Sequence, residues 1–244
     1  MAFIFLPMLD IIFQESTVYL NDFYVESAFV ERINELVETI CVFNGTALRL
    51  PFHLARVRAS CQTLGWEDVS KELLQTWLTS LQILPREYQT GRVMMRTVYN
   101  ETGVCSVTFQ QYQLRPVHSL RCVEADLLHY SLKSTDRSGI TQCVEQRENC
   151  DDVLILRHHL LTDTSIANIA FLNEEQGNCW MTPANPLLRG THRAALLRSG
   201  TIIEDAALSL DRLEEFSRIR LFNAMIGWGE IDLPISAIVS GERG

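Results

Sequence analysis

The spacing of apolar residues changes partway along the chain, and this change constrains the fold more than any other feature. After residue 50, apolar side chains recur every three or four positions, which predicts helices over 51–65 and 67–84. Over 91–127 the period becomes two, which predicts three strands. A strand pair turning at Asn44-Gly45 precedes the helices. This order indicates an α+β unit of about 90 residues.

The second half of the chain predicts another mixture of helices and strands. A polar stretch at 126–138 marks the expected domain boundary. Beyond it we expect helices or turns at 137–147, 190–199 and 209–217, and strands at 152–157, 159–162, 167–172, 179–182, 219–225 and 233–239. The expected fold class is therefore α+β, with two α/β lobes. Its domains are an N-terminal extension of uncertain role (1–34), a small α+β domain (35–128) and a larger α/β domain (129–244).

The N-terminal segment begins with an apolar run, FIFLPMLDIIF at 3–13. Eleven residues are too few to cross a bilayer, and Pro7 and Asp10 interrupt them. A positive start and a small-residue cleavage site, which a signal peptide requires, are both missing from the run. We expect a docked strand or an unusual leader here, or a translation start placed too far upstream. We assign no function to residues 1–34.

Charge and cysteine usage exclude several classes of protein. The chain has 21 basic and 30 acidic residues, a net charge of −9, and its basic residues form no run, so neither a nucleic-acid partner nor a membrane is expected. Seven cysteines are scattered without a CxxC pair, which favours reduced thiols in the cytoplasm and no zinc site. His158-His159 would point to opposite sides of a strand, so we expect no bound metal.

Three local features can carry chemistry, each with an ordinary structural alternative. LRGTHRAALL at 188–197 leads from a glycine into a helix, whose first N–H groups attract anions; the alternative is a plain helix entry. In His53-Leu-Ala-Arg56 both polar side chains share one helical face, and Arg56 suits phosphate; the alternative is a surface arginine. The third feature, LTDTSIAN at 161–168, is either a site or a turn built from Asp and Thr.

Five segments in this order resemble the fold-type IV family of pyridoxal 5′-phosphate (PLP) enzymes. The resemblance covers roughly residues 36–228. Its segments are ETICVFNG with HLAR, RTVYNETG with YQLRPVHSLRCVEAD, YSLKSTDR, DDVLILRHHLLTDTSIANIAF and TPANPLLRGTHR. The family contains branched-chain and D-amino acid aminotransferases and 4-amino-4-deoxychorismate lyases. The resemblance implies PLP as the cofactor and a two-lobed fold.

The resemblance assigns the two ends of the cofactor's chemistry to single residues. Lys133 would bind the cofactor's aldehyde and then move protons. The chain has only one other lysine, Lys71, on the charged side of a predicted helix. Asp163 would pair with the pyridine nitrogen. Many members carry Glu there; Asp is one methylene shorter, so the ring or backbone must lie closer or a water must intervene.

The resemblance also implies a phosphate site. Arg56 would bind the phosphate together with the N–H groups of Ile166 and Ala167 and of Thr191 and His192 at the helix start. The family often has a hydroxyl residue where this chain has His192. Backbone donors survive that change, whereas the side-chain contact does not, and Thr164 or Ser165 could supply a replacement hydroxyl.

The resemblance leaves the reaction open. The matching region is shorter than the transaminases of the family, which favours a lyase that converts 4-amino-4-deoxychorismate into 4-aminobenzoate and pyruvate for folate synthesis. An aminotransferase acting on branched-chain or D-amino acids would need a second carboxylate site, for which we expect Arg92, Arg96 or Arg115; the alternative is surface charge. A non-catalytic homologue is the third possibility. The expected partners are a small amino substrate and a second copy of the chain, as a homodimer.

Overall fold

The computed structural model describes residues 5–24 and 33–240, and its contacts divide the chain into two compact units. Unit 1 runs through Gln113 and also includes Leu132–Thr135. Unit 2 consists of Leu114–Ser131 and the chain from Asp136 onward. The division after Gln113 differs from the boundary expected near residue 130. Both units mix helices and sheet, so the predicted α+β fold class is confirmed.

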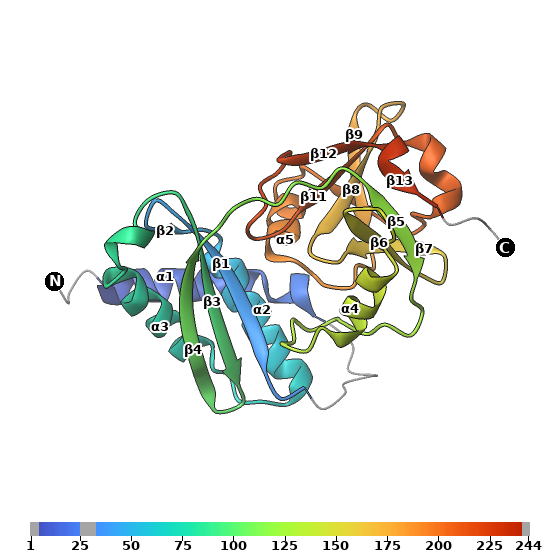
Figure 1. Ribbon diagram of the computed structural model, residues 1–244. Coiled ribbons are helices and arrows are strands. Elements are labelled where there is room, and N and C mark those ends of the chain that lie inside the picture. Colours follow the sequence, from blue (N-terminus) through green and yellow to red (C-terminus); the bar gives the residue numbers. More distant parts are fainter. Residues whose placement is uncertain (1–4, 25–32, 241–244) are drawn as a thin grey trace. The chain divides into compact units, whose positions relative to one another are not determined.

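Unit 1 is built on a four-stranded antiparallel sheet in the order β2-β1-β3-β4 (Figure 1). Its strands are β1 (Leu36–Phe43), β2 (Thr46–Ala47), β3 (Arg92–Asn100) and β4 (Gly103–Gln111). The predicted turn joins β1 to β2, and both Asn44 and Gly45 adopt positive φ, of 48° and 77°. This backbone conformation suits Asn and Gly, so the sequence predicts the hairpin correctly.

Two predicted helices supply the apolar surface that packs on this sheet. They are α2 (Leu50–Leu64) and α3 (Ser70–Gln82), followed by a short 3-10 turn, η3 (Arg86–Tyr88). Gly65 ends α2 with a φ of 69°, as a helix C-terminus favours. Trp77 is fully buried and donates from Nε1 to Thr97 Oγ1 at 2.9 Å. One apolar core therefore joins both helices to β1 and β3.

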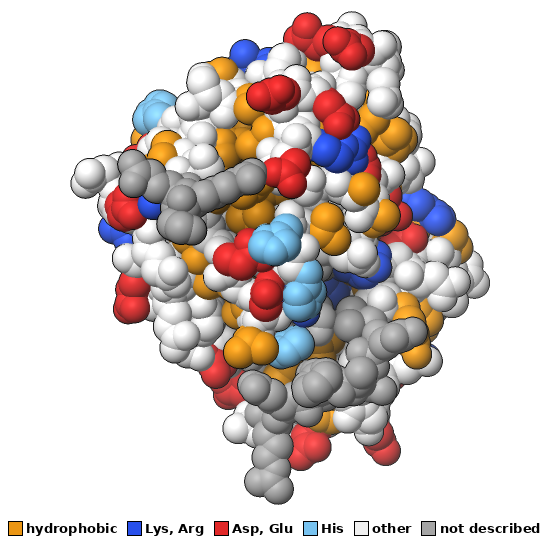
Figure 2. Space-filling view, turned by 90° about the vertical axis from the view of Figure 1, so that its right-hand side faces the viewer, with side chains coloured by type: hydrophobic (Ala, Val, Ile, Leu, Met, Phe, Trp, Pro, Cys, Tyr) orange, Lys and Arg blue, Asp and Glu red, His pale blue; other side chains and the backbone are white. Residues whose placement is uncertain are grey.

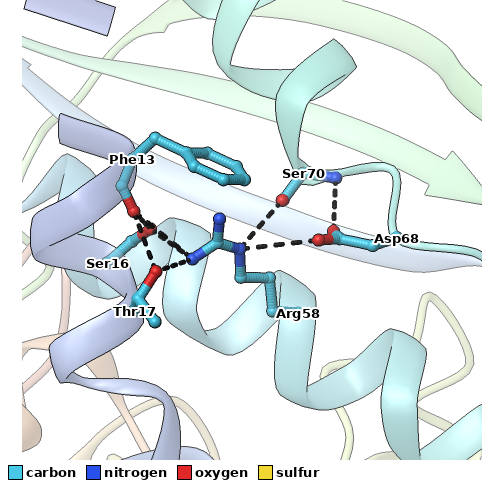
Figure 3. A network of polar contacts seen from close by, with 6 residues as sticks. All are labelled: Phe13, Ser16, Thr17, Arg58, Asp68 and Ser70. Atoms are coloured by element: carbon cyan, nitrogen blue, oxygen red, sulfur yellow. Dashed lines mark hydrogen bonds and ion pairs between the residues drawn. The ribbon is translucent and has the colours of Figure 1, made fainter. Parts of the chain in front are cut away.

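The N-terminal segment forms a helix, α1 (Phe5–Val18), and a 3-10 turn, η1 (Leu20–Phe23), so the expected docked strand is wrong. Pro7 is compatible with this helix because it lies in the first turn, where a missing N–H costs little. Arg58 of α2 attaches α1 to the rest of unit 1 (Figure 3). Its Nη1 donates to Ser16 Oγ and Thr17 Oγ1, and its guanidinium lies over the ring of Phe13. Across the part of the chain that the structure describes, no helix could span a membrane.

Unit 2 contains a nine-stranded mixed sheet in the order β10-β9-β8-β7-β6-β5-β13, with β11 pairing β8 and β12. Its strands are β5 (Leu120–Glu124), β6 (Asp152–Arg157), β7 (Leu160–Thr164), β8 (Asn168–Asn173), β9 (Cys179–Pro183), β10 (Ile203–Asp205), β11 (Arg218–Phe222), β12 (Ile231–Pro234) and β13 (Ile238–Val239). Its helices are α4 (Ser138–Glu145) and α5 (Thr191–Arg198), with 3-10 turns η4 (Leu210–Glu215) and η5 (Ile235–Ala237).

The strand β5 corrects the sequence analysis, which placed it in the small domain. It pairs in parallel with β6, over Leu120↔Asp152 through Glu124↔Leu156, and therefore belongs to unit 2. A period of two identifies a strand but does not reveal its partner. Parallel partners are separated by a long connection, here one that includes α4, and local sequence does not indicate which strands it joins.

The histidine pair corrects a second expectation. His158 and His159 form the turn between β6 and β7, with φ values of 50° and 64°, and do not lie on a strand. The N–H of His158 donates to the side chain of Asp126, and that of His159 donates to the side chain of Glu124. These two acceptors, at and just after the end of β5, hold the turn in place. Histidine and acidic side chains lie next to one another on the face shown in Figure 2.

Candidate active site

Lys133 is held by its backbone at the beginning of β1. Its carbonyl accepts the N–H of Val37 at 2.9 Å, and the next residue, Ser134, forms a bridge with Leu36. On the other side Leu132 is buried in the core of unit 1. The backbone on both sides of the lysine is therefore anchored. Lys71 lies on α3 with its Nζ 5.0 Å from the ring centroid of Phe13, at the attachment of α1.

Arg56 lies in a buried group of three charged or ionisable side chains. Glu38 of β1 accepts from Arg56 Nε at 2.9 Å and from Nη2 at 2.7 Å, so the pair is bidentate. His53, one turn before Arg56 on α2, donates from Nδ1 to the same carboxylate at 2.5 Å. Alternation along β1 turns Glu38 to the side of Leu36 and Ile40, which face the helices.

The charges of this group balance one another. Burial would raise the pKa of Glu38, but the charge of Arg56 and the hydrogen bond from His53 outweigh burial and lower it. Burial lowers the pKa of His53, more than Glu38 raises it. At neutral pH the carboxylate and guanidinium are charged and the imidazole is neutral. Glu38 is a buried partner of Arg56 that the sequence analysis does not identify, although an acidic residue inside the apolar strand LVETICVF is a signal for one.

Asp163 is buried in unit 2 and is held by neutral donors. Asn168 donates from Nδ2 to Oδ1 at 2.7 Å, and the backbone N–H of Leu188 donates to Oδ2 at 2.9 Å. The same amide of Asn168 donates to the carbonyl of Leu188 at 2.8 Å. Asn168 also contacts Gly190 so closely that a Cβ there would collide with its Oδ1. One amide therefore connects the carboxylate with the loop that leads into α5.

Burial raises the pKa of Asp163 to about 7, against the hydrogen bonds from Leu188 and Asn168 and the charge of Arg193. The arrangement favours a cationic donor at this carboxylate, because such a donor would stabilise the ionised form. A protonated ring nitrogen is a donor of this kind. The side chain is buried, at 4% exposure, and both of its carboxylate oxygens are held by hydrogen bonds within unit 2.

The predicted phosphate donors lie on two segments of unit 2. The first is the start of α5, where Gly190 contributes no capping side chain and Thr191 and His192 provide the first N–H groups. The second is the turn 164–167, where Thr164 Oγ1 accepts the N–H groups of Ile166 at 3.4 Å and Ala167 at 3.0 Å. The predicted roles of these N–H groups remain predictions.

Three side chains near these segments are used within the unit. The Nδ1 of His192 lies 2.9 Å from the carbonyl oxygen of Asn223 and 3.1 Å from that of Ile226, so it carries the proton and donates to both. The side chain of Ser165 hydrogen-bonds to buried Asp152, whose pKa is raised by burial. Arg137 Nη2 donates to the carbonyl of Ser165 at 2.6 Å. The imidazole of His192 thus holds the loop 223–226 in place.

Among the predicted substrate arginines, Arg92 and Arg96 are half-buried on β3. Their register places them opposite Phe43 and Thr39 on the face of the sheet away from Glu38. Arg115 lies on no strand but in the segment between β4 and β5, and its Nη2 reaches the carbonyl of Asp151 at 3.4 Å.

The candidate residues fall into two sets. Unit 1 holds Lys133, Arg56, Arg92 and Arg96, and unit 2 holds Asp163, Ser165, Ile166, Ala167, Thr191, His192 and Arg115. Within unit 2, Asn168 hydrogen-bonds to the carboxylate of Asp163, and Asn223 hydrogen-bonds to both the turn and the helix start. Asn168 belongs to the feature LTDTSIAN identified in the sequence, whereas nothing in the local sequence singles out Asn223.

Comparison with known proteins identifies relatives over most of the chain. The model of the family described as amino-transferase class IV matches residues 35–233. An uncharacterized protein of Haemophilus influenzae is 34% identical over 193 residues, which cover 79% of this chain and 98% of the relative. A protein of Schizosaccharomyces pombe named "Putative aminodeoxychorismate lyase" is 28% identical over 214 residues, which cover 78% of this chain and 86% of that protein.

Solved structures agree with this family. A crystal structure from Haemophilus somnus 129pt, described as a putative 4-amino-4-deoxychorismate lyase, is 30% identical with a TM-score of 0.69 and covers 82% of this chain and 100% of its own. A hypothetical aminotransferase from Mycobacterium tuberculosis, in its PLP-bound form, shares the fold at 16% identity with a TM-score of 0.63, covering 85% of this chain and 82% of its own. The predicted fold-type IV architecture is confirmed.

Proposed function

Because the chain belongs to the class IV aminotransferase family of PLP-dependent enzymes, we propose that it is a lyase that converts 4-amino-4-deoxychorismate into 4-aminobenzoate and pyruvate. The observation that carries this choice is the likeness to two lyase-named proteins, at 30% and 28% identity, over most of the chain. We further propose that it acts in the cytoplasm, as a homodimer, in the supply of a folate precursor.

The side chains of unit 2 fit the cofactor. Asp163 is a buried carboxylate whose hydrogen-bond donors are neutral amides, which suits a protonated pyridine nitrogen. The start of α5 and the turn 164–167 offer N–H groups for a phosphate. Asn168 bonds to Asp163 and packs on Gly190 at the start of α5, so ring partner and phosphate donors are held at a fixed spacing.

In unit 1, Lys133 is the proposed covalent partner and proton carrier. When bound, PLP supplies an aldehyde that captures the substrate's amine and a ring that accepts an electron pair. Lys133 Nζ would take the proton from the ring carbon that bears the amine. It would return that proton to the methylene carbon of the departing enolpyruvyl group while the ring C–O bond breaks. The products are 4-aminobenzoate and pyruvate, with no other reactant, and aromatisation favours them.

The first experiment uses the fact that the chain has only two lysines. Wild-type protein incubated with PLP should gain a visible absorption band that borohydride bleaches, as should Lys71→Ala. Lys133→Ala should gain none while its circular dichroism stays unchanged. A band that persists in Lys133→Ala would mean that the lysine is wrong, and protein that never gains a band would match a non-catalytic homologue.

The second experiment separates the two reactions. Pyruvate release from 4-amino-4-deoxychorismate should be seen, and glutamate formation from 2-oxoglutarate with a branched-chain or D-amino acid should not. Amino transfer without pyruvate release would instead support the class IV aminotransferase, with Arg92 and Arg96 as candidates for the substrate carboxylate. Arg92→Ala and Arg96→Ala would then raise the KM for 2-oxoglutarate.

A further inference from the structure

Asn223 follows β11 and connects the two segments that carry the predicted phosphate donors. Its side-chain Nδ2 donates to the carbonyl of Ile166, in the turn 164–167, at 2.9 Å. Its own carbonyl accepts Nδ1 of His192, at the start of α5, at 2.9 Å. We propose that Asn223 is a positioning residue for the cofactor phosphate, which fixes the turn and the helix start relative to each other.

The contact with Ile166 fixes the direction of a predicted donor. The carbonyl of Ile166 and the N–H of Ala167 belong to one planar trans peptide, in which they point in opposite directions. Holding the carbonyl toward Asn223 therefore aims the N–H of Ala167 away from it. That N–H is one of the predicted phosphate donors and in this structure donates to Thr164 Oγ1 at 3.0 Å. Without the amide of Asn223, the hydrogen bond to Thr164 alone would orient this peptide plane.

The remaining atoms of Asn223 fix the residue itself. Its Oδ1 accepts the N–H groups of Met225 at 2.7 Å and Ile226 at 2.8 Å, which closes the loop after β11. His192 then donates to the carbonyls of Asn223 and Ile226, so its imidazole attaches the helix start to that closed loop. Through Asn223 the side chain of His192 therefore connects the predicted donors of the helix start with those of the turn.

The test compares PLP with pyridoxal, which lacks the phosphate. Asn223→Asp keeps the Oδ1 that closes the loop and replaces the N–H donated to Ile166 with a charged carboxylate oxygen that cannot donate. Losing the donor of this hydrogen bond should weaken PLP binding about ten-fold. Pyridoxal binding should stay within about two-fold of wild type. The control for the added charge is Asn173→Asp, because Oδ1 of Asn173 likewise accepts a backbone N–H, that of Gln176; it should change neither affinity.

A second variant tests the other contact and guards against misfolding of the first. His192→Phe keeps an aromatic ring beside Phe222 and removes the Nδ1 donor; it should weaken PLP and not pyridoxal. Binding is followed by absorbance titration, with melting curves of the apo-proteins alongside. Variants that bind PLP as wild type does, or lose PLP and pyridoxal equally, would overturn the proposal. The proposal rests on the proposed cofactor site. If that site were wrong, the result would be different, because wild-type protein itself would not prefer PLP over pyridoxal.

Discussion

Glu38 in unit 1 and Asp163 in unit 2 are both buried carboxylates, and their surroundings shift their pKa values in opposite directions. Glu38 is 1% exposed and lies against Arg56 and His53, and its pKa is lowered. Asp163 is 4% exposed and receives only neutral amide donors in its hydrogen bonds, and its pKa is raised to about 7. Burial raises both; the charge of the neighbour decides the result.

This difference in pKa shift distinguishes Glu38, a structural charge, from Asp163, a carboxylate available for chemistry. Glu38 is neutralised by a partner that the fold itself supplies, so it fixes Arg56 on α2. Asp163 is held in position without a matching charge in its hydrogen bonds, and a cationic ligand would complete it. Pairs of acids with divergent pKa values commonly mark different roles in a site.

Removing Glu38 should have the largest effect on stability. Glu38→Ala leaves Arg56 buried without its counter-charge, so we expect the free energy of unfolding to fall by about 3–5 kcal/mol. Urea denaturation followed by circular dichroism measures it. Glu215→Ala removes the surface partner of Arg212 and should cost far less, because water screens this exposed pair. Equal losses in the two variants would show that Glu38 is not a buried counter-charge.

The pH dependence of stability should reveal Asp163 in the apo-protein. The folded carboxyl keeps its proton to about pH 7, whereas an unfolded aspartate titrates near about pH 4. The folded state therefore binds more protons between these values, and the free energy of unfolding falls as pH rises through that window. The slope is about 1.4 kcal/mol per pH unit, or about 4 kcal/mol in all.

Asp163→Asn should remove this contribution. The difference in unfolding free energy between wild type and Asp163→Asn should change from about pH 4 to about pH 7 and stay constant outside that range. Urea melts at each pH measure it. Parallel curves for the two proteins would mean that Asp163 ionises normally, and the contrast with Glu38 would disappear.

Gly190→Ala tests how Asp163 is held. Because the added Cβ would collide with Asn168 Oδ1, the amide must move from the carboxylate, and we expect a loss of about 1–3 kcal/mol. Gly227→Ala is the control, because there the new Cβ would meet only the carboxyl end of Glu230, at 3.1 Å. A Gly190→Ala variant as stable as this control would show that the contact relaxes freely.

The sequence predicts those features whose cause is local. Apolar periodicity indicates α2, α3, β3 and β4, and the left-handed conformations of Asn44-Gly45 and Gly65 agree with their turn and helix end. Features that depend on distant partners are missed. The partner of β5 lies beyond α4, and the amide of Asn223 reaches a carbonyl 57 residues away.

The candidate site follows the same division. The residue types of Lys133, Asp163 and Arg56 are readable from motifs, whereas the direction of each pKa shift depends on contacts from other elements. Glu38 acts on a helix that begins after the next turn, and Asn168 acts through a loop 20 residues onward. The apolar run of α1 fits a strand as well as a helix in its length and composition, so the sequence does not distinguish the two.

Arg58 is a charged residue in a third kind of environment, and replacing it should have the smallest effect on stability. It is a cation 10% exposed, it donates to Phe13, Ser16 and Thr17 of α1, and Asp68 lies 3.6 Å away. Burial lowers its pKa. Residues 1–34 lie outside the family match at 35–233, so this arginine attaches a helix that lies outside the matched region.

Because Arg58 keeps a little exposure and water can replace part of its contacts, Arg58→Ala should cost about 1 kcal/mol of stability. Faster hydrogen exchange should be confined to the amides of residues 11–18, since the core under α2 and α3 is formed by other side chains. Arg86→Ala, an exposed arginine of η3, is the control. If both variants leave exchange in α1 unchanged, apolar packing of Ile12 and Phe13 holds that helix and the cation is incidental.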